Sequence, residues 1–178
     1  MKTGIRMKIR RFFHIDGIKK RMVYFAVNHL LAGTNPHFFE AKRRLLNMIG
    51  HDVGEGSKVV GPVEWQGTFR CGKNCWIGKN MKINGNGHVV LGDNCDLAPE
   101  ITFQTGGHEI GPAERRAGKG LIFDQSVGSG TWIGGRVTVL NHTHIGASCV
   151  IAGCACVTKD IPDHTAAGGV PAKVIREL

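Results

Sequence analysis

The sequence contains no apolar run as long as the roughly 18 residues that a membrane-spanning helix needs. The apolar stretch at residues 22–32 is too short, and Asn28 and His29 interrupt it. A charged start followed by such a stretch resembles a secretory signal, but Ala32-Gly33-Thr34 is a poor cleavage site. The sequence therefore predicts neither a membrane span nor secretion, and we expect the protein in the cytoplasm.

Aromatic residues are also scarce, at 7% of the chain. A nucleic-acid-binding face needs aromatic side chains interleaved with basic ones. The repeats described below show no such face, so no nucleic-acid partner is expected. The net charge of +9 is concentrated near the start, because residues 1–58 hold 12 of the 23 Lys and Arg but only 4 of the 14 Asp and Glu. Such a segment can meet phosphates, an acidic partner or the inner face of an anionic membrane. The alternative is a solvated basic tail.

The cysteines show no two pairs at the spacing of a zinc ribbon. Most of them fall where the repeat should point into the core, and there cysteine acts as a small apolar residue. We expect free thiols in a reducing compartment, and no bound metal. The six are Cys71, Cys75, Cys95, Cys149, Cys154 and Cys156.

What the chain does have is an apolar residue at every sixth position, a period that fits neither a helix nor simple strand alternation. One run is Leu121, Val127, Ile133, Val139, Ile145, Ile151 and Val157. Earlier runs are Val59, Trp65, Cys71, Ile77 and Ile83, then, after an insertion at 84–88, Leu91, Leu97 and Phe103. The residue four places later is small or modest in size, as at Thr131, Val137, Thr143, Cys149 and Ala155.

This repeat predicts an all-β fold in which each hexad forms one short strand and one turn. Three hexads close one triangular coil, and the coils stack as a parallel β-helix. The aliphatic residue of each hexad points into the prism, and small residues take the other inward position because the corners are tight. The hexads suffice for about five coils, enough for a stable solenoid.

Two segments fall outside the repeat. Asn35 can cap a helix that begins at Pro36 and ends at Gly50. Its apolar face would cover an end of the prism, and residues 10–31 can form a second, basic and apolar helix. The residues of that apolar face are Phe38, Ala41, Leu45 and Ile49.

Between residues 103 and 121 the apolar rule fails, since Glu109 and Arg115 stand at the expected positions. We expect a protruding loop there. The chain then divides into a basic helical segment (1–57), a β-helix (58–164) with a loop near 104–120, and a tail (165–178).

Four segments resemble one family: LGDNCDLAPEITFQTGGH (91–108), GTWIGGRV (130–137), IGASCVIAGCACVTKDIP (145–162) and AAGGVPAKVIREL (166–178). They are similar to the hexapeptide-repeat acetyltransferases, which include galactoside, maltose, nodulation-factor and polysaccharide O-acetyltransferases. The resemblance covers residue 59 to the end. It implies a left-handed β-helix, a homotrimer with acetyl-coenzyme A in the groove between neighbours, and acetyl transfer to an acceptor hydroxyl.

The resemblance also implies roles for individual residues. The base is His108, the histidine of TGGH. Acetyl-coenzyme A would meet Gly135 at the thioester, Gly153, Thr158 and Lys159 along the pantetheine and adenine, and Lys173 and Arg176 at the phosphates. Relatives carry an asparagine that contacts the acceptor, and we place it at Asn84 or Asn86, with Asn80 as the alternative. Arg115 and Arg116 of the loop are expected on the acceptor side.

These roles agree with the chemistry of acyl transfer from a thioester. A neutral imidazole near pH 7 can accept the proton of the attacking hydroxyl. A glycine lets a backbone N–H approach the developing oxyanion. The thiolate of coenzyme A is a good leaving group, so no covalent enzyme intermediate is needed.

Two alternatives use the same fold. VLNHTH (139–144) stands where relatives usually carry a proline-glycine turn, and it puts His142 and His144 on one face of a strand. Such a pair can bind a metal, but the spacing of these histidines, His88 and His108 does not match a β-helical carbonic anhydrase. The second alternative is a non-catalytic scaffold that binds a partner through its basic start. For the acceptor we expect a saccharide, a polysaccharide precursor or lipid-linked glycan, with a serine-like hydroxyl or an amine as alternatives.

Overall fold

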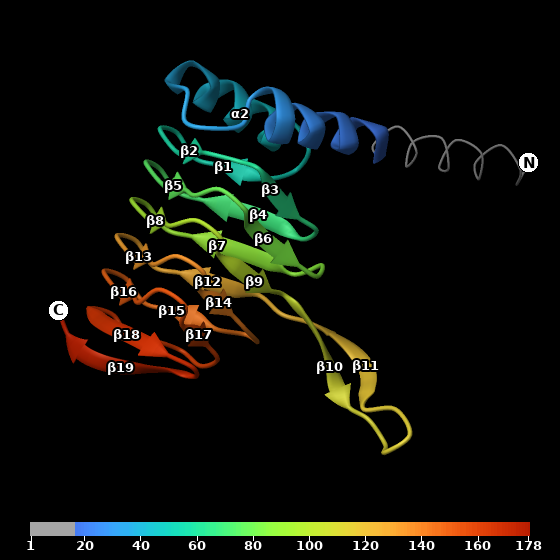
Figure 1. Cartoon of the computed structure of the whole chain (residues 1–178), viewed down its shortest axis with the longest axis vertical. Coiled ribbons are helices and arrows are strands. Elements are labelled where there is room, and N and C mark those ends of the chain that lie inside the picture. Colours follow the sequence, from blue (N-terminus) through green and yellow to red (C-terminus); the bar gives the residue numbers. More distant parts are fainter. Residues whose placement is uncertain (1–16) are drawn as a thin grey trace, which may run out of the picture.

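The computed structural model describes residues 17–178, which form a parallel β-helix closed at one end by helices (Figure 1). Three parallel sheets make the three faces of the prism. The first face contains β1 (Asp52–Val53), β4 (Thr68–Cys71), β7 (His88–Leu91), β12 (Gln125–Val127) and β15 (His144–Ile145). The second contains β2 (Lys58–Val59), β5 (Trp76–Ile77), β8 (Asp96–Leu97), β13 (Trp132–Ile133), β16 (Val150–Ile151) and β18 (Thr165–Gly169), with β19 (Ala172–Glu177) antiparallel to β18. The third contains β3 (Val63–Trp65), β6 (Met81–Asn84), β9 (Thr102–Gln104), β14 (Thr138–Val139) and β17 (Cys156–Val157).

The solenoid is longer than the repeat predicts. The second face holds six parallel strands, so the fold has about six turns and the prediction of about five is wrong. At the start, β1 already pairs with β4 ahead of residue 58. At the end, the expected tail contributes β18, which pairs with β16, and β19, which folds back on β18.

The hexad positions lie inside the prism, as predicted. Ile77, Ile133 and Ile151 are 0% exposed, and Ile133 stands in register between Leu97 and Ile151 of the neighbouring coils. Burial of one such side chain contributes about 1.5–3 kcal/mol. Leu121 is the exception, because it belongs to an antiparallel strand outside the prism and is only half-buried.

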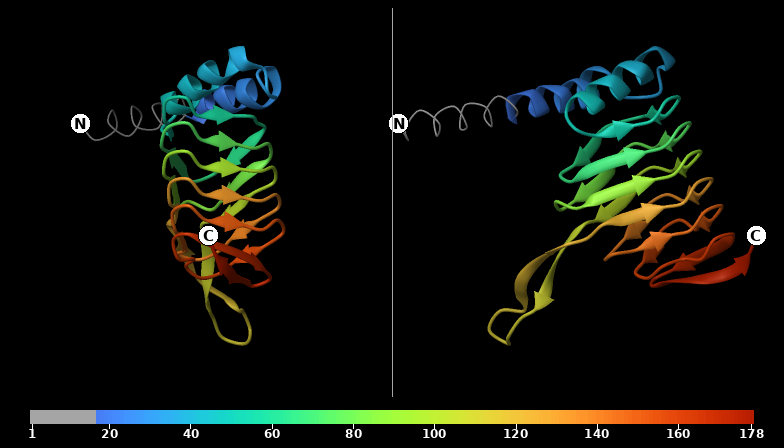
Figure 2. Two further views of the ribbon diagram at one scale, coloured as in Figure 1. Left: turned by 90° about the vertical axis from the view of Figure 1, so that its left-hand side faces the viewer. Right: turned by 180° about the vertical axis from the view of Figure 1, so that it is seen from behind.

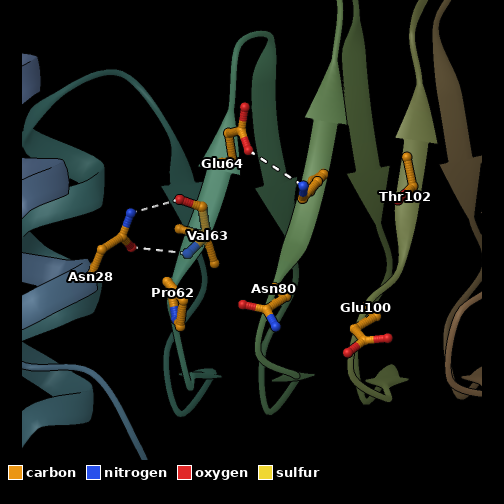
Figure 3. A pocket seen from close by; sticks show the side chains of 8 residues that line it. Asn28, Pro62, Val63, Glu64, Asn80, Glu100 and Thr102 are labelled. Atoms are coloured by element: carbon orange, nitrogen blue, oxygen red, sulfur yellow. Dashed lines mark hydrogen bonds and ion pairs between the residues drawn. The ribbon is translucent and has the colours of Figure 1, made fainter.

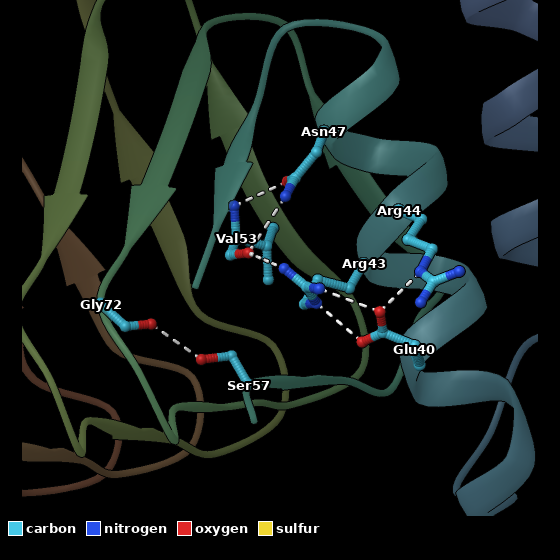
Figure 4. Close-up of polar contacts among 7 residues, drawn as sticks. All are labelled: Glu40, Arg43, Arg44, Asn47, Val53, Ser57 and Gly72. Atoms are coloured by element: carbon cyan, nitrogen blue, oxygen red, sulfur yellow. Dashed lines mark hydrogen bonds and ion pairs between the residues drawn. The ribbon is translucent and has the colours of Figure 1, made fainter. Parts of the chain in front are cut away.

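Small residues at one inward corner satisfy buried carbonyl groups as well as filling little space. The Thr131 hydroxyl donates to the Gly146 carbonyl at 2.8 Å, and the Ser57 hydroxyl donates to the Gly72 carbonyl at 2.8 Å (Figure 4). A buried carbonyl without a donor costs about 1–3 kcal/mol, so this corner favours small donors. The thiols of Cys75, Cys95 and Cys149 donate in the same way to Gly92, Gly128 and Pro162.

Helix α2 (Pro36–Met48) begins and ends where the sequence predicts. The Asn35 side chain accepts from the His37 N–H at 3.1 Å, and the chain leaves the helix at Gly50 with a φ of +99°. The buried face differs from the predicted one, because the helix is rotated on the prism. Lys42, Leu46 and Ile49 are buried, whereas Phe38, Ala41 and Leu45 are half-buried.

The polar side chains of α2 close the first coil. Asn47 accepts from the Val53 N–H at 2.7 Å and donates to its carbonyl at 3.1 Å, which covers the free backbone edge of β1 (Figure 4). The buried Lys42 ammonium donates to the carbonyls of Gly33 at 2.9 Å and Val60 at 3.1 Å. Burial lowers the pKa of Lys42 to about 8.

The first helix occupies residues 17–25 and continues into the π-helical turn η1 (Ala26–Leu30). Val23 and Val27 pack into the core beneath it. Residues 10–16 of the predicted helix, and most of the basic start, lie outside the described residues. None of the helices within residues 17–178 is long and apolar enough to cross a membrane.

The interruption of the repeat is a two-stranded arm rather than a loop. β10 (Gly106–Ile110) pairs antiparallel with β11 (Ala117–Ile122). The arm leaves the prism after β9 and rejoins it before β12, and it projects well beyond the coils (Figures 1 and 2). Antiparallel pairing explains why the six-residue period fails here.

Candidate active site

His108 lies on the arm, with its imidazole exposed. Its Nδ1 is 3.0 Å from the carbonyl oxygen of Gly118 on the facing strand. Because a carbonyl can only accept, Nδ1 carries the proton in this contact. The neutral imidazole therefore keeps a free lone pair on Nε2, which is the arrangement that a general base needs.

The predicted acceptor residues do not gather around His108. Asn84 ends β6 and Asn86 lies in the bend after it, next to the root of the arm, where the Asn84 carbonyl accepts from the Thr105 N–H at 2.8 Å. Arg115 and Arg116 lie at the exposed tip, between β10 and β11. The structure thus separates the two pairs along the arm, and their acceptor role stays a prediction.

Gly135 and Gly153 stack at one corner of the prism. The Gly135 carbonyl accepts from the Cys154 N–H at 2.8 Å, and a Cβ atom on Gly153 would lie 3.2 Å from that oxygen. A shallow hollow of about 220 Å³ opens beside them, lined by Pro99, Glu100, Gly135 and Arg136. Only residues without side chains leave this corner open to a ligand.

The remaining predicted donor residues belong to the last coils. Thr158 and Lys159 follow β17, and the Thr158 carbonyl accepts from the Asn141 side chain at 3.4 Å. Lys173 and Arg176 lie exposed on β19. These cations stand on the same end of the solenoid as Gly153, with solvent around them.

The arm that carries His108 and the glycine corner belong to different corners of the prism. The arm lies between β9 of the third face and β12 of the first, whereas Gly135 lies between β13 of the second face and β14 of the third. Both views show the arm projecting away from the side of the prism that carries β13, β16 and β18 (Figures 1 and 2).

A cavity of about 680 Å³ runs along the third face, lined mostly by polar side chains (Figure 3). Glu64 and Lys82 form an ion pair across it at 3.7 Å. Glu100 lines both this cavity and the hollow beside Gly135, so the two adjoin. The lining residues are Asn28, Pro62, Val63, Glu64, Asn80, Lys82, Glu100 and Thr102.

Asn80 lines this cavity together with Asn28, whereas the two preferred acceptor candidates, Asn84 and Asn86, do not. Asn80 stands at a corner with a φ of +61°, in the same stacked position as Glu100 (φ +67°) and Arg136 (φ +61°) of later coils. That shared corner position is the signal that could have selected it, because the positive φ favours asparagine. The insertion after Asn84 obscured the register.

The histidine pair after β14 is engaged within the chain. His142 and His144 are both exposed, on either side of the buried Thr143, so they share one face as the alternation predicts. His142 Nδ1 accepts from the Asp124 N–H at 3.2 Å, and His144 Nδ1 lies 2.7 Å from the Ser126 hydroxyl. Among residues 17–178, no three His, Cys, Asp or Glu side chains are grouped so as to hold a metal ion.

The cysteines are free thiols, and four of them are buried. The hydrogen bond to Cys75 and then burial raise the pKa of the Cys71 thiol above its ordinary value. None of the four lies beside His108 or the glycine corner, so they serve the core.

No family model matches the sequence, but individual relatives do. The chain is 32% identical over 167 residues to galactoside O-acetyltransferase of Escherichia coli (strain K12), covering 90% of this chain and 78% of the relative. A solved galactoside acetyltransferase in complex with coenzyme A is 29% identical, with a TM-score of 0.77 over 91% of this chain and 80% of that one.

A hexapeptide-repeat acetyltransferase from Vibrio cholerae O1 biovar eltor, solved with acetyl-coenzyme A, shares the fold with a TM-score of 0.78. It is 24% identical and covers 93% of this chain and 88% of that one. The Escherichia coli relative matches at more than the level of fold, across most of both chains. The protein is therefore an enzyme of the hexapeptide-repeat acetyltransferase family.

Proposed function

We propose that this enzyme transfers the acetyl group of acetyl-coenzyme A to a hydroxyl of a saccharide, with His108 as the general base. The observation that carries the proposal is the imidazole itself. Its Nδ1 proton is engaged by the Gly118 carbonyl at 3.0 Å, and its Nε2 is free on an arm that projects from the fold. The relatives named above bind coenzyme A or acetylate a galactoside, which supports the same chemistry here.

Each step uses groups of this chain. The Nε2 atom of His108 takes the proton of the attacking hydroxyl, while the Gly118 carbonyl stabilises the imidazolium through Nδ1. The backbone N–H at Gly135 faces the oxygen that becomes negative as the new C–O bond forms. The C–S bond then breaks, coenzyme A leaves as a thiol with the proton from His108, and the acetyl ester remains on the acceptor.

The acceptor is proposed to lie in the cavity of the third face. Its lining offers the carboxylates of Glu64 and Glu100, the ammonium of Lys82 and the amide of Asn80. Such groups hydrogen-bond to several hydroxyls at once, as a sugar ring requires. We place the enzyme in polysaccharide or lipid-linked glycan biosynthesis, in the cytoplasm.

We further propose a homotrimer of left-handed prisms, in which the arm of one subunit crosses the glycine corner of the next. The direction of the arm, which projects away from the strands β13 and β16 of the same chain, supports this assembly (Figure 1). A cyclic arrangement repeats the same contact at every interface and gives each subunit one complete site.

The first test is release of free thiol from acetyl-coenzyme A against a panel of sugars and amino acids. We expect turnover with a sugar, and a loss of at least about 100-fold in His108→Ala, since general base catalysis contributes that much. His37→Ala, an exposed histidine of α2, should match the wild type. Undiminished turnover in His108→Ala would move the base elsewhere.

The assembly can be tested by complementation. His108→Ala removes the base and Gly135→Trp fills the glycine corner, so each variant alone should be inactive. In co-expressed mixed trimers about a quarter of the sites pair an intact arm with an intact corner, and activity should return to that level. If mixing restores nothing although the trimers form, the site lies within one chain.

The first helix supports a contact with an anionic membrane. Ile18, Met22 and Phe25 form an exposed apolar stripe, 46%, 67% and 57% exposed. Lys19 and Arg21 flank the stripe on either side, and the preceding residues add more basic side chains. A helix with an apolar stripe between basic flanks lies at the surface of anionic lipid.

Sedimentation with vesicles tests this contact. The full chain should bind vesicles rich in phosphatidylserine more than pure phosphatidylcholine, and Met22→Glu with Phe25→Glu should abolish the binding. Val170→Glu is the matched control, because Val170 is an apolar residue at least as exposed, at 76%, at the other end of the solenoid. If the double variant instead dissociates the oligomer, the stripe contacts a second copy.

A further inference from the structure

Three side chains pack the root of the arm where it joins the prism: Phe123, Gln125 and His142, called the arm-root clamp below. All three lie outside the strands of the arm itself. They link the chain that enters the arm, the chain that leaves it and the next coil.

The Phe123 ring fills the space beside Gly107, the residue directly before His108. A Cβ atom on Gly107 would lie only 2.7 Å from Cε2 and 3.0 Å from Cζ of this ring. The ring also meets the His142 imidazole, with 5.1 Å between centroids and 76° between planes. The Phe123 N–H also donates to the Thr105 carbonyl at 2.9 Å. The ring therefore packs against both His142 and the backbone that leads to the base.

His142 is oriented by its own hydrogen bond. Its Nδ1 accepts from the Asp124 N–H at 3.2 Å, directly after Phe123 in the chain. This bond and the edge contact with Phe123 define the position of the ring at the corner. These two contacts assign a structural role to His142, which stands where relatives usually carry a proline-glycine turn.

Gln125 ties the two ends of the arm to the next coil. Its side chain is 2% exposed, and Nε2 lies 3.1 Å from the Gln104 carbonyl, where the chain departs for the arm. The same nitrogen lies 2.9 Å from the Asn141 carbonyl and 3.1 Å from that of Val139. One buried amide thus joins both ends of the arm to the coil that carries His142.

We infer that the arm-root clamp is the device that positions His108, with Phe123 and His142 as positioning residues. The inference rests on the proposed function. Within one chain the arm is a lone antiparallel pair, which has little stability of its own, so its root fixes the direction in which it leaves the prism. A displacement of the base by about 1 Å can cost about 100-fold in rate.

The first test compares Phe123→Ala and His142→Ala with the conservative variants Phe123→Leu and His142→Asn. The alanine variants should lower kcat about 10- to 100-fold, with KM for acetyl-coenzyme A changed less than twofold. The conservative variants should retain most of kcat, since leucine fills the space and the asparagine oxygen can accept from Asp124. If the alanine variants have the same kcat as the conservative variants, the inference is overturned.

A size exchange makes the test sharper. Gly107→Ala places a methyl group against the Phe123 ring and should lower kcat, although the backbone of Gly107 suits alanine. Adding Phe123→Leu should restore part of the loss, so the double variant is more active than Gly107→Ala alone. A double variant as poor as the product of the two single losses would show that the ring and Gly107 act independently.

Hydrogen exchange gives a readout that does not depend on activity. In Phe123→Ala and His142→Ala, amides of residues 106–122 should exchange at least about 10-fold faster, while those of β5 and β13 keep their protection. Unchanged exchange in the arm would overturn the inference even in an inactive enzyme. Faster exchange in the arm of a protein without acetyl transfer would sustain the clamp and refute the proposed function alone.

Discussion

Glu100 and Arg136 form an ion pair of 2.8 Å between two neighbouring coils, at the point where the cavity of the third face meets the hollow beside Gly135. Both residues have a left-handed backbone, with φ of +67° and +61°, at stacked corners of the prism. The Arg136 guanidinium therefore holds the Glu100 carboxylate at the junction of the proposed acceptor and donor sites.

Loss of this ion pair should affect substrate binding more than folding. In Arg136→Gln we expect KM for the acceptor to rise several-fold, because Glu100 is no longer held, while the melting temperature stays within a few degrees, as exposed pairs contribute about 0–1 kcal/mol. Steady-state kinetics and thermal unfolding measure the two effects. Arg44→Gln, which removes an exposed ion pair on α2, is the matched control and should change neither. An unchanged KM for the acceptor in Arg136→Gln would show that the Glu100–Arg136 ion pair takes no part in acceptor binding.

Side-chain volume at the glycine corner should control access of acetyl-coenzyme A. Gly153→Val brings a branched side chain against the Gly135 carbonyl, which lies 3.2 Å from the first added carbon. We expect KM for acetyl-coenzyme A to rise at least about tenfold, since a crowded site forfeits contacts worth about 1.4 kcal/mol or more. Gly17→Ala, with open space around it, should leave KM as it is. Binding of coenzyme A can be followed by calorimetry. If Gly153→Val binds coenzyme A as tightly as the wild type, acetyl-coenzyme A does not bind at the glycine corner.

The hydrogen bonds of the Thr131 hydroxyl at the inner corner should contribute strongly to the stability of the protein. Its hydroxyl donates to the Gly146 carbonyl at 2.8 Å and accepts from the Cys149 N–H at 3.0 Å. Thr131→Val keeps the shape and leaves two buried groups unpaired, so we expect the free energy of unfolding to fall by about 2–4 kcal/mol. Thr131→Ser keeps both bonds and should cost less than about 1.5 kcal/mol. Urea unfolding compares the two, and a loss in Thr131→Val no larger than that in Thr131→Ser would show that the hydroxyl bonds do not dominate at this position.

Stability should fall in mild acid because of His51. Its Nδ1 accepts from the Phe69 N–H at 3.2 Å, so Nε2 carries the proton and donates to the Tyr24 hydroxyl at 2.8 Å. Burial, and secondarily the charge of Lys20, lowers the pKa of His51 to about 4. The unfolded chain, with an ordinary histidine pKa, binds the proton first as the pH drops.

The contribution of His51 is therefore complete above about pH 6.5 and is lost as the pH falls toward 4, by at most about 3 kcal/mol. Urea unfolding of the wild type at pH 7, 5.5 and 4.5 measures this loss. His51→Gln, which can keep one of the two bonds, should show a shallower dependence on pH over that interval. The same slope in both proteins would assign the acid sensitivity to other groups.

The solenoid could be predicted from the sequence because its period is local. An inward residue every six positions, as at Ile133, Val139 and Ile145, specifies a short strand and a turn without reference to distant parts of the chain. The ends of α2 were predictable for the same reason, since Asn35 and Gly50 act on the backbone beside them. His108 could be proposed as the base because the segment that contains it resembles the hexapeptide-repeat acetyltransferases.

Other features depend on contacts between distant segments, and only the tertiary structure decided them. The arm exists because residues 106–110 pair with 117–122, and no periodic pattern marks that pairing. The rotation of α2 follows from the buried Lys42, whose acceptors Gly33 and Val60 lie outside the helix. Asn80 enters the cavity because coils stack at equal corners, a register that the insertion at 84–88 hides in the sequence. The sequence by itself determined the period, the helix ends and the candidate base, since these are set by neighbouring residues. The tertiary structure decided where His108 points and what it can meet, since these depend on how separate coils and the arm are joined.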